Sequence, residues 1–461
     1  MALHPHRPRP GTLDHRRLLA LLLAMTLAVT AAACGGDDAG DGQVTASEDD
    51  GGDDVDSDGD IADMDDDGGF DLDIGGGGAD EDLDNEDLIE VVQEFWEDNG
   101  DDADVDFERL PDERIAAVPG DDDPPTCGGQ PIPADAVSQN AFAAPCPEGL
   151  TVAWDPALID GTLTDLFGQA GPAVVFAHEF GHVVQFQSGV LDITGQGIGD
   201  PPSVIVENQA DCYAGAWVAE QVDEGFGPFN EPSALDNSLG AMIFVRDQPG
   251  SDPRGELAHG SGFDRVRAFQ DGVDRGVEYC AGYIEDPPFI SQLPFEGDDV
   301  ANQGNLPFDD VSELVIQDLS DFFDGNVDDF DDPGDPFDFV PADELEELHA
   351  EIGDGAVATV FGMIWAQAAQ QAAGEDLDGE GPLLQRACLV GAWLGDILRD
   401  QQDDQVDRPS GVALSPGDLD EVIITFLQLT QEAMSGAGIA FESIGSMRQG
   451  VFNGLDACSL G

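Results

Sequence analysis

Two histidines four residues apart lie inside an apolar stretch, at Ala177-His178-Glu179-Phe180-Gly181-His182. In a helix, residues four apart lie on one face, so His178 and His182 can project toward a single metal ion. The flanking residues are apolar on most sides of such a helix, which is typical of a helix buried in a core. We therefore expect a core helix that begins near Gly171-Pro172 and ends at Gly189.

A second motif, Glu207-Asn-Gln-Ala-Asp211, places two carboxylates one helical turn apart. Catalytic zinc sites use three protein ligands and leave the fourth position open. We expect Glu207 to be the third ligand and Asp211 to accept a hydrogen bond from a ligand histidine. Glu179 is placed to take a proton from a water molecule that zinc activates. The alternative for Glu207 and Asp211 is a solvated acidic helix face.

Further segments match one protein family in order along about two hundred residues, from Leu88 to Tyr283. They are Glu94-Phe95-Trp96, Pro125-Thr126-Cys127, Asn140 to Phe142, Cys146-Pro147, Val152 to Asp155, Ala177 to Gln185, Glu207 to Trp217, His259 to Ser261, Arg265 to Phe269, and Gly276 to Cys280. This part of the chain resembles the neutral zinc metallopeptidase family, which belongs to the zincins with a glutamate ligand. The resemblance implies one catalytic zinc ion on His178, His182 and Glu207.

The resemblance also implies a function for the chain, which is hydrolysis of peptide bonds in a peptide or protein substrate. Glu179 would be the general base, and Asp211 would support a ligand histidine. His259 lies in a matching segment and would hydrogen-bond the oxyanion of the reaction, with a structural loop hydrogen bond as the alternative. The competing function is a non-catalytic extracellular scaffold or binding lipoprotein stabilised by its metal; the presence of Glu179 argues against it, because a structural site needs no base.

An internal repeat organises the rest of the chain. The segment Cys212 to Trp217 recurs as Cys388 to Trp393, and Phe263 to Cys280 recurs as Phe441 to Cys458. A repeat of about 180 residues indicates two related helical units, because solenoid repeats are about 20 to 50 residues long. We expect a mainly α fold (α+β with a minor sheet), in which a zincin-like metallopeptidase domain packs against a degenerate second helical repeat.

The second unit lacks the residues that would bind zinc. Leu383 and Ala387 stand in place of Glu207 and Asp211, and the preceding helical stretch 360–365 contains no histidine. Only the first unit can therefore hold zinc by this chemistry, and the second is expected to contribute packing.

The repeat also predicts disulfides. Six cysteines follow Cys34, an even number that is typical of exported proteins with structural disulfides. The matched cysteines of the two units are expected to pair within each unit, and one pair is then left. The expected bridges are Cys212–Cys280, Cys388–Cys458 and, by elimination, Cys127–Cys146.

The first residues resemble an export signal. Arginines precede a short apolar run that ends at Ala31-Ala32-Ala33-Cys34, a sequence similar to a bacterial lipobox. We expect cleavage of residues 1–33 as a lipoprotein signal peptide, lipidation of Cys34, and an extracytoplasmic protein attached to the cell membrane by this lipid. The alternative is secretion without a lipid anchor.

The chain is strongly acidic, with a formal net charge of −83, and all of its basic residues are arginine. Such a charge excludes nucleic acid as a partner and leaves the lipid anchor as the sole expected contact with a membrane. Residues 34–85 are rich in Asp and Gly and are expected to form a disordered tether. The segment Asp54 to Asp65 matches a calcium-loop pattern, but no helices flank it, so ordered Ca²⁺ binding there remains the lesser alternative.

These features divide the chain into five segments. After the signal peptide (1–33) and the tether (34–85), residues 86–285 are expected to form the zinc metallopeptidase domain. Residues 286–345 are expected to be an acidic connector or surface insertion, and 346–461 the degenerate repeat.

Overall fold

The computed structural model describes residues 83–460, apart from 120–123, 193–200, 256–257, 298, 376, 378, 403–409 and 434–437, and apart from the side chains of 430–433. The signal peptide, Cys34, the calcium-loop pattern at 54–65 and nearly all of the tether lie outside the described residues. No helix in the described ranges combines the length and the apolar character that crossing a membrane requires.

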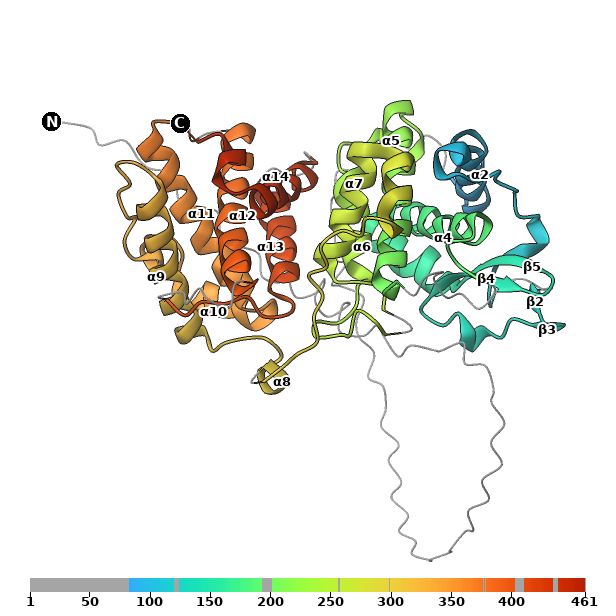
Figure 1. Cartoon of the computed structure of the whole chain (residues 1–461), viewed down its shortest axis with the longest axis horizontal. Helices are drawn as coiled ribbons and strands as arrows, with labels where there is room; N and C mark the ends of the chain where they lie inside the picture. The colour runs from blue at the N-terminus through green and yellow to red at the C-terminus, as the bar shows by residue number, and fades with distance from the viewer. Residues whose placement is uncertain are drawn as a thin grey trace, which may run out of the picture.

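Within the described residues, the first unit has five long helices around a shared apolar core (Figure 1). They are α2 (Asn85–Asn99), α4 (Ala170–Ser188), α5 (Ser203–Glu224), α6 (Ala234–Phe244) and α7 (Gly262–Ala281), with a π-helical segment η4 (Ala157–Leu163) and the short α3 (Thr164–Phe167) before α4. As predicted from the sequence, α4 is buried along most of its length and ends at Gly189, which adopts a left-handed conformation.

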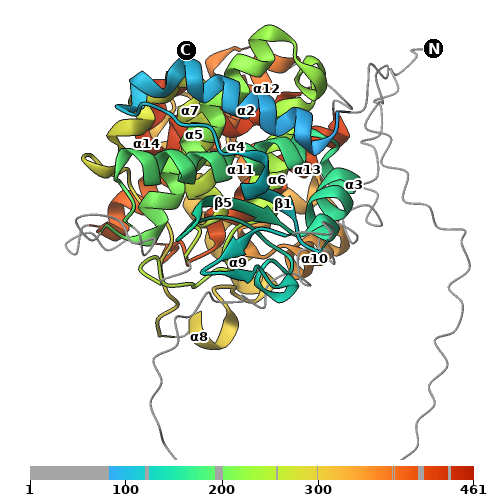
Figure 2. The same cartoon turned by 90° about the vertical axis from the view of Figure 1, so that its right-hand side faces the viewer.

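A small sheet covers one side of α4 (Figure 2). Its strands are β1 (Ile115–Ala117), β4 (Ala141–Cys146) and β5 (Gly149–Trp154), in the order β1-β5-β4, and a separate pair is formed by β2 (Thr126–Cys127) and β3 (Gln130–Pro131). β5 runs parallel to β1 and antiparallel to β4, with Ala141 opposite Trp154. The Trp154 ring packs edge-on against Phe176 of α4, at 5.1 Å between centroids, and so fixes the sheet on the helix.

In the described residues of the second unit all regular secondary structure is helical, and the molecule as a whole is mainly α. Its helices are α9 (Phe308–Asn326), α10 (Ala342–Glu351), α11 (Asp354–Ala373), α12 (Glu380–Gln402), α13 (Asp418–Ala433) and α14 (Ile439–Asn453), and the short α8 (Asp299–Asn302) precedes them. Short 3₁₀ segments complete both units: η1 (Gly100–Ala103), η2 (Asp112–Arg114), η3 (Ala134–Ala136), η5 (Gly227–Asn230), η6 (Gly282–Ile284), η7 (Pro336–Asp338) and η8 (Leu455–Cys458).

The repeat seen in the sequence corresponds to a repeated helix crossing. α5 packs on α7 in the first unit, and α12 packs on α14 in the second. A Cβ atom added to Gly215 or Gly272 would lie 2.0 or 1.9 Å from a backbone oxygen of the facing helix, and the equivalent Gly391 and Gly450 show 1.9 and 2.0 Å. Only glycine permits this approach, which explains why both units carry glycine at these positions.

The same symmetry accounts for the disulfides. Gly276 and Gly454 have φ angles of 76° and 69°, and each turns the chain so that the following cysteine returns to the partner helix. The structure contains all three expected bridges, Cys212–Cys280, Cys388–Cys458 and Cys127–Cys146. The two equivalent bridges span 68 and 70 residues, so each closes a loop of nearly the same length.

Residues 286–345, which the sequence predicts as an acidic connector or surface insertion, form part of the folded core in the structure. Their central part forms α9, which packs on α11 and buries Val311, Val315, Leu319 and Phe323. Acidic residues occupy the remaining faces of this helix, and their abundance in the sequence concealed the apolar stripe at helical spacing. The second unit therefore begins before residue 346, because α9 lies on α11 much as α2 lies on α4.

The two units meet through a reciprocal pair of helix caps. Asp236 of α6 accepts hydrogen bonds from Ala440 and Phe441 N–H at the start of α14. Asp420 of α13 accepts them from Gly262 and Phe263 N–H at the start of α7. Each carboxylate occupies the third position of its helix and satisfies free N–H groups of the other unit. The interface is thus a pseudo-two-fold one, with α6, α7, α13 and α14 at its centre.

Candidate metal centre

α4 positions the two histidines and the glutamate between them. His178 and Glu179 are 5% and 6% exposed, and His182 faces the same direction one turn later. The helix can approach α5 closely because Gly181 lies against the backbone of Ala210, where a Cβ atom would be 3.0 Å from the Cα atom. This contact brings the acidic motif of α5 beside the histidines.

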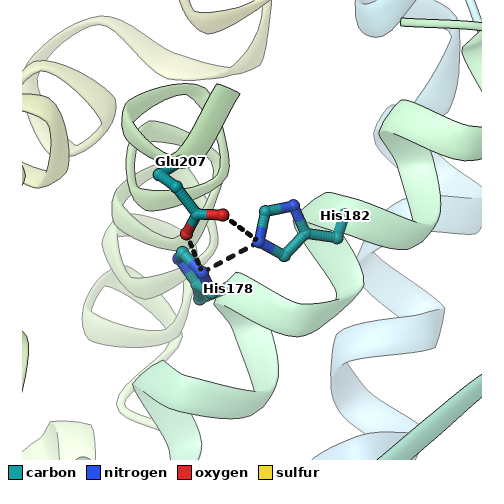
Figure 3. A group of neighbouring side chains, drawn as sticks. All are labelled: His178, His182 and Glu207. Atoms are coloured by element: carbon teal, nitrogen blue, oxygen red, sulfur yellow. Dashed lines mark hydrogen bonds and ion pairs between the residues drawn. The ribbon is translucent and has the colours of Figure 1, made fainter. Parts of the chain in front are cut away.

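Glu207 of α5 completes a compact triangle with the two histidines (Figure 3). The Nε2 atoms of His178 and His182 are 3.1 Å apart. Glu207 Oε2 is 3.3 Å from His178 Nε2, and Oε1 is 3.4 Å from His182 Nε2. The structure therefore brings together the three residues that the sequence predicts as metal ligands.

Asp211 and Arg265 orient His178. The His178 Nδ1–H donates to Asp211 Oδ1 at 2.7 Å, because a carboxylate oxygen can only accept. Arg265 of α7 donates from Nε and Nη2 to the two oxygens of Asp211, at 3.0 and 2.7 Å, and from Nη1 to the carbonyl of Val245. Asp211 is fully buried and Arg265 is 2% exposed. This bidentate pair holds the carboxylate, and through it the imidazole, in one orientation.

Gln185 orients His182. Its Nε2 donates to the carbonyl of Val206, so its Oε1 faces His182 Nδ1 at 2.7 Å and accepts a hydrogen bond. Gln209 Oε1 also accepts from Gln185, and Gln209 Nε2 donates to the carbonyl of Cys280. The side chains thus link the histidine to the disulfide-bonded end of α7.

The second unit contains the same glutamine chain without the histidines. Gln370 Nε2 donates to the carbonyl of Pro382 and to Gln385 Oε1, and Gln385 Nε2 donates to the carbonyl of Cys458. The second unit has this network without counterparts of His178 and His182. The network therefore serves mainly to join the helices of each unit. The Asp211–Arg265 pair has no such counterpart, since Ala387 and Ser443 occupy the equivalent positions.

The donor set fits a zinc ion. With both Nδ1 atoms committed as donors, the two Nε2 lone pairs point toward each other and toward a carboxylate, and Glu207 Oε2 is buried without a hydrogen-bond partner among the described residues. Such converging groups require positive charge between them, either from a metal ion or, without metal, from protons. Zinc–ligand bonds of about 2.0–2.1 Å at tetrahedral angles place ligand atoms about 3.3 Å apart, close to the observed 3.1–3.4 Å.

The pKa values of the site residues also show that positive charge is favoured there. Burial alone would lower the pKa of His178, but the carboxylates of Asp211 and Glu207 outweigh it and raise that pKa to about 10. The pKa of His182 is also raised, because Glu207 outweighs the effect of burial. Burial would raise the pKa of Asp211, yet Arg265 and His178 hold it below its ordinary value. In the absence of metal, the site therefore retains protons.

Two further groups lie close to the predicted ligands, Glu179 near His182 and His259 near Glu207. Glu179 has a buried Oε2 without a hydrogen-bond partner among the described residues, so this oxygen is free to accept a proton. His259 keeps 43% of its side chain exposed, and its Nδ1 lies 3.5 Å from Asp247 Oδ1. Asp247 also accepts from the N–H groups of His259 and Gly260, which fixes the loop. Burial lowers the pKa of His259, but Asp247 and Glu207 together raise it above its ordinary value.

Three supporting residues had no role assigned from the sequence, namely Gln185, Asp247 and Arg265. Gln185 is recognisable only after the repeat shows Gln370 in the same place. Arg265 carried a usable signal, since it interrupts an apolar helical face in a chain with 15 basic residues against 98 acidic ones. Such a rare charge inside a core requires a carboxylate partner.

Similar proteins occur in mycobacteria. Uncharacterized proteins of Mycobacterium tuberculosis and Mycobacterium bovis are each 31% identical to this chain over 150 residues. The match covers 28% of this chain and 51% of each relative, so the chain spans about half the length of the curated relatives it matches. No protein-family model matches the chain, and no solved structure matches it significantly.

Proposed function

We propose that this protein is a zinc-dependent metallopeptidase with a zincin-like first unit, which hydrolyses peptide bonds in peptides or proteins. The observation that carries the proposal is the triangle of His178 Nε2, His182 Nε2 and a Glu207 oxygen, with edges of 3.1–3.4 Å. Three protein ligands leave the fourth zinc position open, which is typical of catalytic rather than structural zinc. A scaffold protein with a structural zinc ion would have no use for the open position.

The residues around the triangle suit hydrolysis. When bound, zinc supplies Lewis-acid chemistry, which polarises a carbonyl group and makes a water molecule acidic. Glu179 offers a buried carboxylate oxygen that has no partner in the part of the chain that the structure describes, and this oxygen can accept the proton of the water and pass it to the leaving amine. His259 would donate a hydrogen bond to the developing oxyanion, and Asp247 favours its protonated form for that purpose.

The sheet suggests where an extended peptide would bind. β4 is an edge strand of the described sheet and packs on α4, the helix that carries both histidines. An edge strand can accept an extended segment as a further antiparallel strand, with specificity from side-chain pockets. In this proposal the mature protein acts outside the cytoplasm and is attached to the membrane by a lipid on Cys34.

Chelation tests the proposed function directly. The protein, purified with zinc, should cleave members of a broad peptide library; 1,10-phenanthroline should abolish the cleavage, and added Zn²⁺ should restore it. The assay is done at low and at high salt, because self-repulsion in a chain with a net charge of −83 destabilises the folded state and salt screens it. A folded, zinc-loaded protein that cleaves no peptide at either salt concentration would refute the peptidase and favour the scaffold function.

A further inference from the structure

Three carboxylates converge inside the second unit, in a group separate from the zinc ligands. Asp354 begins α11, and Asp418 and Glu421 lie on the first turn of α13. Their exposed fractions are 6%, 5% and 7%, and each contributes an oxygen to a set whose members all lie within 4.8 Å of one another. Three buried negative charges at this spacing repel one another strongly.

The backbone satisfies only part of each carboxylate. Leu306 N–H donates to Asp354 Oδ2 at 3.0 Å, Ser415 N–H to Asp418 Oδ2 at 2.8 Å, and Gly355 N–H to Glu421 Oε2 at 2.8 Å. No donor among the described residues reaches Asp354 Oδ1, although this atom is buried. The group therefore contains an unpartnered buried acceptor that points to a missing positive charge.

The arginines of the described residues do not supply that charge. Arg246 pairs instead with Asp420, the residue between Asp418 and Glu421. His349 of α10 lies near Asp354, but its Nε2–H donates to the carbonyl of Leu306. Either protons or a metal ion must neutralise this group.

We propose that Asp354, Asp418 and Glu421 bind one hard divalent cation of the calcium class. All three ligands are carboxylates, and oxygen-only sites select Ca²⁺, Mg²⁺ or Mn²⁺ over zinc. Calcium suits the site better than magnesium, which binds mainly through its own waters and requires near-ideal octahedral geometry. A cavity of about 20 Å³, lined by Asp354, Asp418 and Trp393, adjoins the group and has room for one water ligand.

The cation would secure the start of α13 and, through it, the interface between the units. Asp420, flanked by two of the proposed ligands, caps α7, and α7 carries Arg265 of the zinc centre. This proposal does not depend on the peptidase activity, because none of its ligands takes part in the zinc centre.

Terbium luminescence tests the proposal on the full chain. Tb³⁺ occupies calcium sites and emits when a nearby tryptophan is excited, and Trp393 lines the adjoining cavity. The cluster variant is Asp354→Asn/Asp418→Asn/Glu421→Gln. The control variant, Asp321→Asn/Asp324→Asn/Asp328→Asn, removes the same charge from exposed positions of the same unit. The acidic N-terminal segment contributes the same background to every variant.

We expect wild type and control to show sensitised emission that Ca²⁺ displaces at about 10⁻³ M or less, and the cluster variant to need at least about 10-fold more Ca²⁺. Trp393→Phe should lose the emission while keeping the calcium affinity. This variant tests the location of the site if the cluster variant does not fold. Ca²⁺ should also raise the melting temperature of wild type more than Mg²⁺ at the same concentration. Equal effects of Ca²⁺ and Mg²⁺, or equal titrations of wild type and cluster variant, would overturn the proposal in favour of shared protons.

Discussion

At the scale of single residues, the second unit serves as a natural control for the candidate zinc centre. It retains the glutamine chain (Gln370 and Gln385) but replaces the residues specific to the metal. Met363, Gln367 and Leu383 stand where the first unit has His178, His182 and Glu207. The comparison separates side chains that hold the helices together from those that only the proposed zinc ion would need.

Asp211→Ala should weaken zinc binding about 10- to 100-fold, because it frees His178 to rotate. The single variant also leaves Arg265 buried without its carboxylate, which would lower the free energy of unfolding as well. The double variant Asp211→Ala/Arg265→Ser reproduces the pair found in the second unit and removes that unpaired charge. Zinc titration and thermal unfolding of both variants should show stability recovered in the double variant and zinc affinity still reduced; full recovery of affinity would contradict the assigned role of Asp211.

Zinc binding should release protons even in mildly alkaline buffer. The pKa of His178 is raised to about 10 in the metal-free site, so a proton occupies the site below that pH and must leave when zinc binds. Calorimetry at about pH 8 in two buffers of different ionisation enthalpy should give about one proton released per zinc ion. Asp211→Ala, which removes a cause of the raised pKa, should lower that number. A binding enthalpy independent of buffer would show that His178 is unprotonated before zinc arrives.

At the scale of helices, the reciprocal caps allow a matched pair of substitutions. Asp236→Ala and Asp420→Ala each remove a carboxylate that holds the N-terminus of a helix in the other unit. Each should lower the free energy of unfolding by about 1–2 kcal/mol. Only Asp420→Ala should also weaken zinc binding, because Asp420 caps α7 and α7 carries Arg265. Equal zinc affinities in the two variants would show that the start of α7 does not position the metal centre.

Much of the helical framework could be predicted from the sequence. The spacing of apolar residues gave α4, and the matched cysteines and glycines gave the paired crossings of α5 with α7 and of α12 with α14. The sequence did not predict α9, because acidic residues dominate this segment. Only apolar residues three to four positions apart mark the face that is buried. The caps by Asp236 and Asp420 join residues about 160 to 200 positions apart, and no local pattern reveals such partners.

For the candidate site the division is similar. Helical periodicity places His178 with His182, and Glu207 with Asp211, one turn apart, and the family resemblance implies that the two pairs form one site. The sequence could not show which side chains orient the imidazoles, because Gln185 and Arg265 act through tertiary contacts. The buried carboxylates of the second unit also remained hidden among 98 acidic residues, most of which serve only as solvated charge.

At the scale of the whole molecule, the net charge of −83 opposes compaction. Salt shortens the range of this repulsion, from about 10 Å at 0.1 M to about 3 Å at 1 M. The melting temperature should therefore rise when NaCl is increased from about 0.1 to about 2 M, with a larger rise than a protein of balanced charge shows. Differential scanning calorimetry at matched zinc content measures this, and a salt-independent melting temperature would mean that the described ion pairs and caps already offset the repulsion.

We predict that Glu179 is needed for turnover and not for metal binding. Glu179→Gln keeps the size of the side chain but replaces the carboxylate that would accept the proton, so the variant should hold zinc as wild type does and lose peptide hydrolysis. His182→Ala is the matched control that should lose both. The decisive measurement is zinc content and peptidase rate on the same folded samples of the three proteins. Retention of both zinc and full activity by Glu179→Gln, or absence of zinc from wild type, would contradict the proposed function.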